Sequence, residues 1–424
     1  MLGKRSLYVG VLLLGLLLVL QTAVAYGAGK VQLNFWSLRT EDVPAYQKFI
    51  KAFEAENPGI TVKFTAYKNT EYRNILKTAI LGGSGPDLFW SSEFTMLQEY
   101  ADNGYLMPLD GKVPDIKTNF RPGDLEGVRG SDDKVYGIPH GSYVYGVYYN
   151  KNAFKKFGLA EPQSWPELIK AAQAIKGAGA VPFAQGTKDS WTLQECMFEG
   201  AFGPTFLHGR EWYDAAVKGK TNFLDPRFVK ALENLLDLKQ FFPAGYEGIS
   251  YTDMQMLFTQ ERAAMFIGGS WEIGFFERMN PRLDFDMAIG FPETKDGPYW
   301  LATPANCTVV NAKTKHPAEV IKFMDFLASK EFGQMYSNEL KTMTPILGVK
   351  YTHPIFAKAS KRLDDAKGVV PFLYSYPVFN REEPAGDVLF ANGLQAMFAG
   401  KRMPKQVAED IQNGIAKWYK PFKH

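Results

Sequence analysis

Hydrophobic and polar positions alternate between strand-like and helix-like spacing along residues 31–90. Val31–Trp36 alternates with a period of two, as a β-strand does. Pro44–Phe53 then carries apolar residues at helical spacing, and Asn57-Pro58-Gly59 ends that helix. Strand, helix, strand, helix and strand in this order predict a parallel sheet with helices on both faces. The remaining predicted elements are a strand at Ile60–Tyr67, a helix at Glu71–Ile80 and a strand at Asp87–Trp90.

The same α/β pattern resumes in the second half of the chain. Val144–Tyr149 predicts a strand, and a further apolar strand is expected at Ala263–Ile267. Ser164-Trp165-Pro166-Glu167 predicts a helix start, because serine is favoured at the N-cap and proline in the first turn. Further helices are predicted at Arg227–Phe241, Ala318–Ser329 and Val407–Trp418. The chain is therefore expected to be α/β throughout.

The N-terminal segment has the three parts of a secretory signal peptide. Lys4 and Arg5 precede an uncharged apolar run from Leu7 to Leu20, and Ala23-Val24-Ala25 follows it. Such a pattern predicts a signal peptide at residues 1–25 that is cleaved after Ala25, so that the mature protein lies in the periplasm. The alternative is an uncleaved membrane anchor, which needs about 20 apolar residues.

Length, charge and cysteine content narrow the class of protein. About 400 mature residues exceed what one hydrophobic core usually serves, so two lobes are expected. The 48 basic and 45 acidic residues nearly balance, which does not favour a nucleic-acid partner. An oxidising compartment would permit a disulfide between Cys196 and Cys307, but two small buried residues are the preferred interpretation.

A series of short segments occurs in a fixed order along nearly the whole mature chain. The segments are Leu33–Ser37, Phe53–Val62, Gly82–Leu88, Gly104–Asp110, Tyr136–Pro139, Tyr148–Lys151, Ser164–Leu168, Arg262–Met265, Gly269–Trp271 and Phe323–Ser329. Each segment alone is a weak signal, but the ordered series is specific. In this order the segments resemble the extracellular solute-binding proteins, family 1, which are relatives of maltose-binding protein.

The resemblance implies a class II, two-lobe periplasmic-binding-protein-like α/β fold with a ligand cleft between the lobes. The N-terminal lobe would comprise residues 26–142 plus 304–343, and the C-terminal lobe residues 146–300 plus 347–424. The chain would cross between them three times, near Ser142–Gly146, Trp300–Asn306 and Met343–Leu347. The lobes would close by a hinge motion.

The resemblance also implies a function in transport. The protein would act as a monomer that captures a carbohydrate and delivers it to the membrane permease of an ABC importer. Energy would come from a separate ATPase, and the chain contains no Gly-x-x-x-x-Gly-Lys-Ser/Thr string. No enzyme activity, catalytic residue, metal or cofactor is expected.

Candidate site residues follow from the chemistry of sugars, which have an apolar C–H face and a rim of hydroxyl groups. Trp271 is the first candidate, because it follows Gly268-Gly269-Ser270 at a strand-to-helix turn, where the family often places a stacking aromatic. Alternation puts Tyr143 and Tyr145 on one side of the chain, and Tyr143 is preferred. The other candidates are Ser37, Arg39, Glu41, Ser92, Glu93, Asp189, Trp191, Trp300, Asn306, Tyr374 and Arg381.

Two other classes of function stay open. Glu41, Glu93 and Asp189 could serve a secreted carbohydrate-active enzyme, whose chemistry needs two carboxyl groups at a defined separation. The same three carboxylates could bind a polyamine. An iron site at Tyr148-Tyr149 is disfavoured because this pair coincides with the family's structural Tyr-Asn-Lys element. The five histidines are dispersed and show no ligand spacing.

Overall fold

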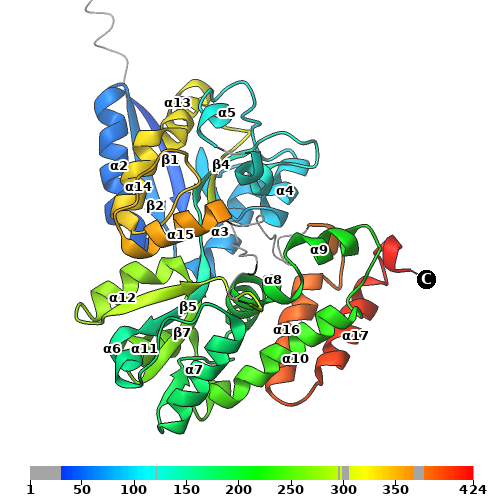
Figure 1. Cartoon of the computed structure of the whole chain (residues 1–424). Helices are drawn as coiled ribbons and strands as arrows, with labels where there is room; N and C mark the ends of the chain where they lie inside the picture. Colours follow the sequence, from blue (N-terminus) through cyan, green and yellow to red (C-terminus); the bar gives the residue numbers. More distant parts are fainter. Residues whose placement is uncertain (1–29, 121, 295–296, 298–304, 366–376, 424) are drawn as a thin grey trace, which may run out of the picture. The chain divides into compact units, whose positions relative to one another are not determined.

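The fold is seen in a computed structural model that describes residues 30–120, 122–294, 297, 305–365 and 377–423 (Figure 1). The chain divides into two compact units: residues 1–89 with 313–323, and residues 90–312 with 324–424. Within the described ranges no helix has the length and apolar character needed to cross a membrane. The predicted signal segment lies outside the described residues, as do Trp300 and Tyr374.

The first unit contains the strands and helices predicted from the start of the chain. Strand β1 (Val31–Ser37) pairs in parallel with β2 (Ile60–Ala66) and with β3 (Leu88–Ser91). Phe35 is fully buried on β1, and its ring packs edge-to-face on Phe64 at a centroid distance of 5.1 Å. The parallel pairing predicted for this unit is therefore confirmed. The connecting helices are η1 (Thr40–Asp42), α2 (Val43–Glu56) and α3 (Asn69–Leu81).

The second unit contains a four-stranded sheet with the order β6-β7-β5-β8. Strand β5 (Tyr145–Asn150) lies antiparallel to β7 (Ala263–Gly269) and to β8 (Phe285–Ile289), whereas β6 (Val181–Phe183) is parallel to β7. The α/β pattern predicted for this part of the chain did not specify the direction of its strands. Strands buried on both faces read as continuous apolar runs, which carry no information on strand direction.

Another antiparallel pair and most of the helices also belong to the second unit. Strand β4 (Gly137–Gly141) pairs with β9 (Ala305–Val310), and α13 (Pro317–Ala328) starts in the first unit and ends in the second. The other helices are α4 (Thr95–Asp102), α5 (Ile116–Asn119), η2 (Pro122–Val128), α6 (Lys151–Lys156), α7 (Trp165–Gly177), the π-helix η3 (Thr192–Phe202), α8 (Gly203–Phe206), α9 (Arg210–Val217), α10 (Pro226–Asp237), η4 (Leu238–Phe241), η5 (Tyr246–Gly248), α11 (Tyr251–Thr259), η6 (Ser270–Glu272), α12 (Ile273–Met279), α14 (Lys330–Leu340), α15 (Pro354–Asp365), η7 (Pro377–Phe379), α16 (Gly386–Phe398), α17 (Pro404–Ile415) and η8 (Lys420–Phe422).

The predicted start of α7 is confirmed, together with the positions expected for its serine and proline. Ser164 occupies the N-cap in an extended conformation, and Pro166 lies in the first turn. The Ser164 side chain makes no capping hydrogen bond in this structure. Proline is well suited to this first turn, because the N–H that it lacks would have no partner within the helix there.

Both cysteines are free and buried, which confirms the preferred interpretation. Cys307 on β9 directs its thiol toward the carbonyl oxygen of Ser91, 3.2 Å away. Burial raises the pKa of both thiols, so neither is activated as a thiolate.

Two of the three expected interlobe crossings lie side by side. The backbone N–H of Ser142 donates a hydrogen bond of 2.9 Å to the carbonyl of Met343, and the two residues form an isolated antiparallel bridge. The expected lobe boundaries and the crossings themselves stay predictions.

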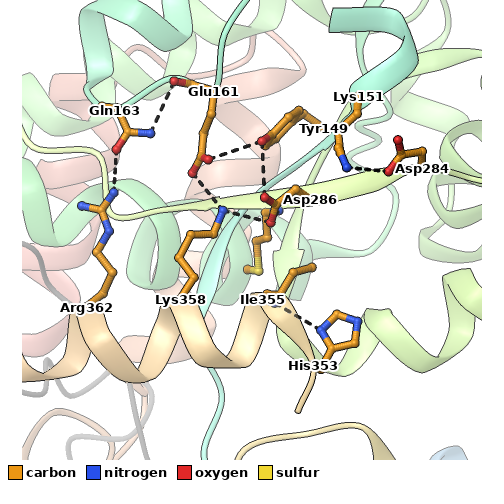
Figure 2. Close-up of polar contacts among 11 residues, drawn as sticks. Tyr149, Lys151, Glu161, Gln163, Asp284, Asp286, His353, Ile355, Lys358 and Arg362 are labelled. Atoms are coloured by element: carbon orange, nitrogen blue, oxygen red, sulfur yellow. Dashed lines mark hydrogen bonds and ion pairs between the residues drawn. The ribbon is translucent and has the colours of Figure 1, made fainter. Parts of the chain in front are cut away.

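A polar network attaches α15 to the edge of the four-stranded sheet (Figure 2). The Lys358 ammonium contacts Glu161 at 3.0 Å and Asp286 at 2.9 Å. The Tyr149 hydroxyl donates to the same two carboxylates, and its pKa is raised by burial first and then by their charges. Partly buried pairs that share partners hold two elements together better than isolated exposed pairs do.

Backbone packing around β5 gives a stability prediction. A Cβ on Gly146 would lie 2.2 Å from the carbonyl oxygen of Ala288 on β8, so Gly146→Ala must displace a paired strand. We expect a loss of about 3 kcal/mol in the free energy of unfolding, measured by denaturant titration. Gly177→Ala is the control, because Gly177 ends α7 with nothing within 4 Å of a new Cβ. It should be neutral or stabilise by up to about 1 kcal/mol.

Candidate functional site

Trp271 lies where the sequence predicted it, in the turn that joins β7 to α12. It is the middle residue of η6, and its ring is partly buried. The indole folds back over the end of β7, where a Cβ on Gly269 would come within 1.9 Å of its Cζ3 atom. Only glycine at position 269 leaves room for this ring. Gly269 therefore has a steric reason as well as a turn function, while a Cβ on Gly268 would meet the Phe266 ring instead.

Trp271 belongs to a group of five aromatic side chains that pack on one another, which we call the aromatic cluster. Its members are Tyr143, Tyr145, Trp191, Tyr251 and Trp271. Ring centroids are 4.9 Å apart for Tyr143 and Trp271, 5.3 Å for Tyr145 and Trp271, and 4.6 Å for Trp191 and Tyr251. All three pairs are edge-to-face, which is the arrangement that ring quadrupoles favour. Tyr145 is 4 % exposed, while the other four rings are partly exposed.

A buried carboxylate lies behind the cluster. Glu272 has no exposed surface, and its Oε1 accepts hydrogen bonds from the Trp271 Nε1–H at 3.1 Å and from the Tyr251 hydroxyl. Its Oε2 accepts a hydrogen bond of 2.8 Å from the Gln255 amide. Burial, and after it the charge of Glu272, raises the pKa of Tyr251. The phenol therefore stays protonated and remains a donor.

Asp189 joins the cluster through the backbone of α11. Its Oδ2 accepts a hydrogen bond of 2.7 Å from the backbone N–H of Tyr251, the first residue of that helix. Trp191 follows two residues later at the N-cap of the π-helix. The acid-plus-aromatic pair expected from the sequence is thus present, with Asp189 holding the helix that carries Tyr251.

A third carboxylate reaches the cluster from the π-helix. The Tyr145 hydroxyl donates a hydrogen bond of 2.8 Å to Glu195, one turn after Trp191. Burial raises the pKa of Glu195 to about 7, against the opposing effect of the Tyr145 hydrogen bond. The Tyr145 ring packs on Gly200, where a Cβ would fall 2.4 Å from it. π-Helices are rare and occur often at functional sites.

The structure brings together four of the predicted site residues, namely Tyr143, Asp189, Trp191 and Trp271. Alternation correctly placed Tyr143 and Tyr145 on one side, and both rings contact Trp271.

A role in ligand binding stays a prediction for every candidate, and the remaining ones lie elsewhere in the chain. Ser92 and Glu93 are partly buried in the loop after β3, while Arg381 is exposed and its charge acts on Tyr419. Ser37 is buried at the end of β1, and Arg39 forms an ion pair with Asp42 at 2.5 Å. Glu41 lies in η1 and Asn306 in β9, with side chains outside the described structure, and Trp300 and Tyr374 lie outside it entirely.

Sequence reasoning missed Tyr251, Gln255, Glu272 and Glu195. One signal was available: Tyr251 and Gln255 are four residues apart and therefore share one face of a helix. Glu272 had no signal beyond its position next to Trp271, and no periodicity predicted the π-helix that carries Glu195. Among the described residues no group of three His, Cys, Asp or Glu side chains could hold a metal ion.

Comparison with known proteins defines the class. Residues 36–334 match the family model of the bacterial extracellular solute-binding proteins, and the chain belongs to this family. The multiple sugar-binding protein of Streptococcus mutans is 28 % identical over 329 residues, which are 76 % of each chain.

Solved structures share the fold. RafE from Streptococcus pneumoniae is 23 % identical and superposes with a TM-score of 0.73, covering 93 % of this chain and 99 % of its own. A solute-binding protein from Thermotoga lettingae bound with α-D-tagatose is 20 % identical, with a TM-score of 0.71 and coverage of 92 % and 99 %. The two-lobe periplasmic-binding-protein-like α/β fold expected from the sequence is thereby confirmed.

The raised pKa of Glu195 gives a prediction of pH dependence. The folded protein keeps this proton up to about pH 7, whereas an unfolded glutamate releases it near pH 4.5, so raising the pH between these values favours unfolding. The free energy of unfolding of the parent, minus that of Glu195→Gln, should fall by up to about 3 kcal/mol over this window and level off above it. Denaturant titrations of both proteins at several pH values measure this difference. A difference that is constant with pH would show that Glu195 is ionised in the folded protein throughout.

Proposed function

We propose that this chain is the carbohydrate-binding receptor of an ABC importer, which captures a mono- or oligosaccharide and delivers it to a membrane permease. The observation that carries the proposal is the aromatic cluster, in which four rings remain partly exposed beside carboxylates. A sugar needs ring faces for its C–H groups and polar side chains for its hydroxyls. Each hydroxyl buried without a partner would cost about 1–3 kcal/mol.

The relatives support a sugar as cargo. The names of similar proteins include a multiple sugar-binding protein and a maltotriose-binding protein of Pyrococcus abyssi, and RafE has been solved in complex with raffinose. The sugars in these names are chemically different, so the proposal extends to carbohydrates as a class.

The proposal includes export and partners. Residues 1–25 act as a signal peptide that is removed, and the mature monomer meets its permease outside the inner membrane. Membership of an extracellular family supports this location. The protein binds its ligand without converting it, and a separate ATPase supplies the energy of import.

A polyamine is the second candidate cargo, and one feature of the site favours it. Asp189 and Glu195 lie beside rings whose faces could also attract an ammonium group. The sugar proposal is preferred because the named relatives bind sugars.

A ligand screen tests the class of cargo. A ligand present at 100 times its dissociation constant stabilises the folded protein by about 2.7 kcal/mol, which a thermal shift detects. We expect shifts from one or a few mono- or oligosaccharides and none from amino acids or polyamines. Incubation with the same labelled sugar should return it unchanged. A shift from polyamines alone would replace sugar as the cargo, and a cleaved product would make the protein an enzyme.

The aromatic cluster can be tested directly by removing its central ring. Trp271→Ala should weaken sugar binding at least ~10-fold, because the ligand loses an aromatic platform. Titration calorimetry measures the loss, and circular dichroism checks that the protein stays folded. Trp418→Ala is the matched control, since Trp418 is also partly buried in the second unit and donates its indole N–H to Pro384. Equal affinity of the parent and Trp271→Ala would remove Trp271 from the site.

A further inference from the structure

The indole N–H of Trp271 is already in use. Its Nε1 lies 2.9 Å from the Tyr251 hydroxyl oxygen and 3.1 Å from Glu272 Oε1, so one donor is shared between two acceptors. Tryptophan has no other hydrogen-bonding group. Trp271 can therefore offer a ligand its ring face and no hydrogen bond.

Glu272 is held in place by side chains from α11. Gln255 donates to its Oε2 and Tyr251 to its Oε1, and these two residues lie one turn apart on that helix. The start of α11 is in turn bound to Asp189, in the loop before the π-helix. The carboxylate thus connects the turn that carries Trp271 to α11 and, through Asp189, to the start of the π-helix, where Trp191 lies.

The arrangement uses both oxygens of the Glu272 side chain. Three donors converge on them: an indole N–H and a phenol O–H on Oε1, and an amide N–H on Oε2. An aliphatic side chain of similar size would leave the Tyr251 hydroxyl and the Gln255 amide without this acceptor, and the indole N–H with the Tyr251 hydroxyl alone. Because that hydroxyl would itself have lost its acceptor, it would no longer hold the indole in one orientation.

We propose that Glu272 is a positioning residue that fixes the Trp271 indole by its N–H, so that Trp271 binds the apolar C–H face of a sugar without contacting its hydroxyl rim. This inference rests on the proposed function and adds which part of the sugar Trp271 recognises. Hydroxyl recognition is left to other polar side chains. Steric packing on Gly269 fixes the opposite side of the same ring.

A double-mutant cycle tests whether Glu272 acts through the indole N–H. Glu272→Leu should weaken sugar binding about 10-fold in the parent protein and less than about 3-fold in a Trp271→Phe background, where no N–H remains to be fixed. Glu272→Gln keeps an acceptor and should restore affinity to within about 3-fold of the parent. Equal losses from Glu272→Leu in both backgrounds would overturn the proposal.

A second readout needs no ligand. The indole N–H resonance of Trp271 is identified by its absence from the spectrum of Trp271→Phe. This resonance should move upfield, and its proton should exchange faster with solvent, in Glu272→Leu. Neither change is expected in the control Glu199→Leu, which removes a different fully buried carboxyl group, located on the π-helix. An unchanged resonance in Glu272→Leu would also overturn the proposal.

The outcomes separate this inference from the proposed function. If the parent binds no sugar, the proposed function fails, while the resonance still tests whether Glu272 fixes the indole. If Glu272→Leu does not fold, Gln255→Leu takes its place in the cycle, because it removes the donor that holds Oε2. Gln255→Leu should weaken sugar binding less than Glu272→Leu would, and it should have no effect in the Trp271→Phe background. An equal loss of affinity in the parent and in Trp271→Phe would count against the proposal.

Discussion

The antiparallel register of β5 and β7 is the constraint on which the aromatic cluster depends. Tyr145 pairs with Gly269, and just beyond the strands the backbone N–H of Ser270 donates to the carbonyl of Val144. The Ser270 hydroxyl accepts from the N–H of Val144, and the Tyr148 hydroxyl donates to the carbonyl of Gly269. Because a slip of one residue would move every side chain to the opposite face, this register alone brings Tyr143 and Tyr145 beside Trp271.

The aromatic cluster also requires that its rings approach the backbone closely. The Trp271 indole lies over Gly269 and the Tyr145 ring over Gly200, at distances where a Cβ could not fit. Gly146 allows β8 to approach β5 in the same way. The two ring contacts each give a large aromatic surface a rigid support at a position where only hydrogen projects from the backbone.

Two carboxylates of the site have different roles because their surroundings differ. Glu272 is fully buried and accepts hydrogen bonds from three side chains, an arrangement suited to holding groups in place. Glu195 accepts a hydrogen bond from Tyr145. Its pKa is nevertheless raised to about 7, because the effect of burial exceeds the opposing effect of that hydrogen bond. A group of this kind responds to pH and to any ligand that changes its solvation.

The sequence by itself determined the helices and strands of the first unit, the family, and the turn that carries Trp271. Apolar periodicity and glycine or proline turns are local properties, and an ordered series of short segments survives wide divergence. Only the tertiary structure decided the antiparallel direction of β5 and the partners of the tryptophan. Tyr145 and Glu195 are 50 residues apart, and Tyr148 and Gly269 are 121 apart. Such contacts depend on strand register and helix packing, which no local pattern encodes.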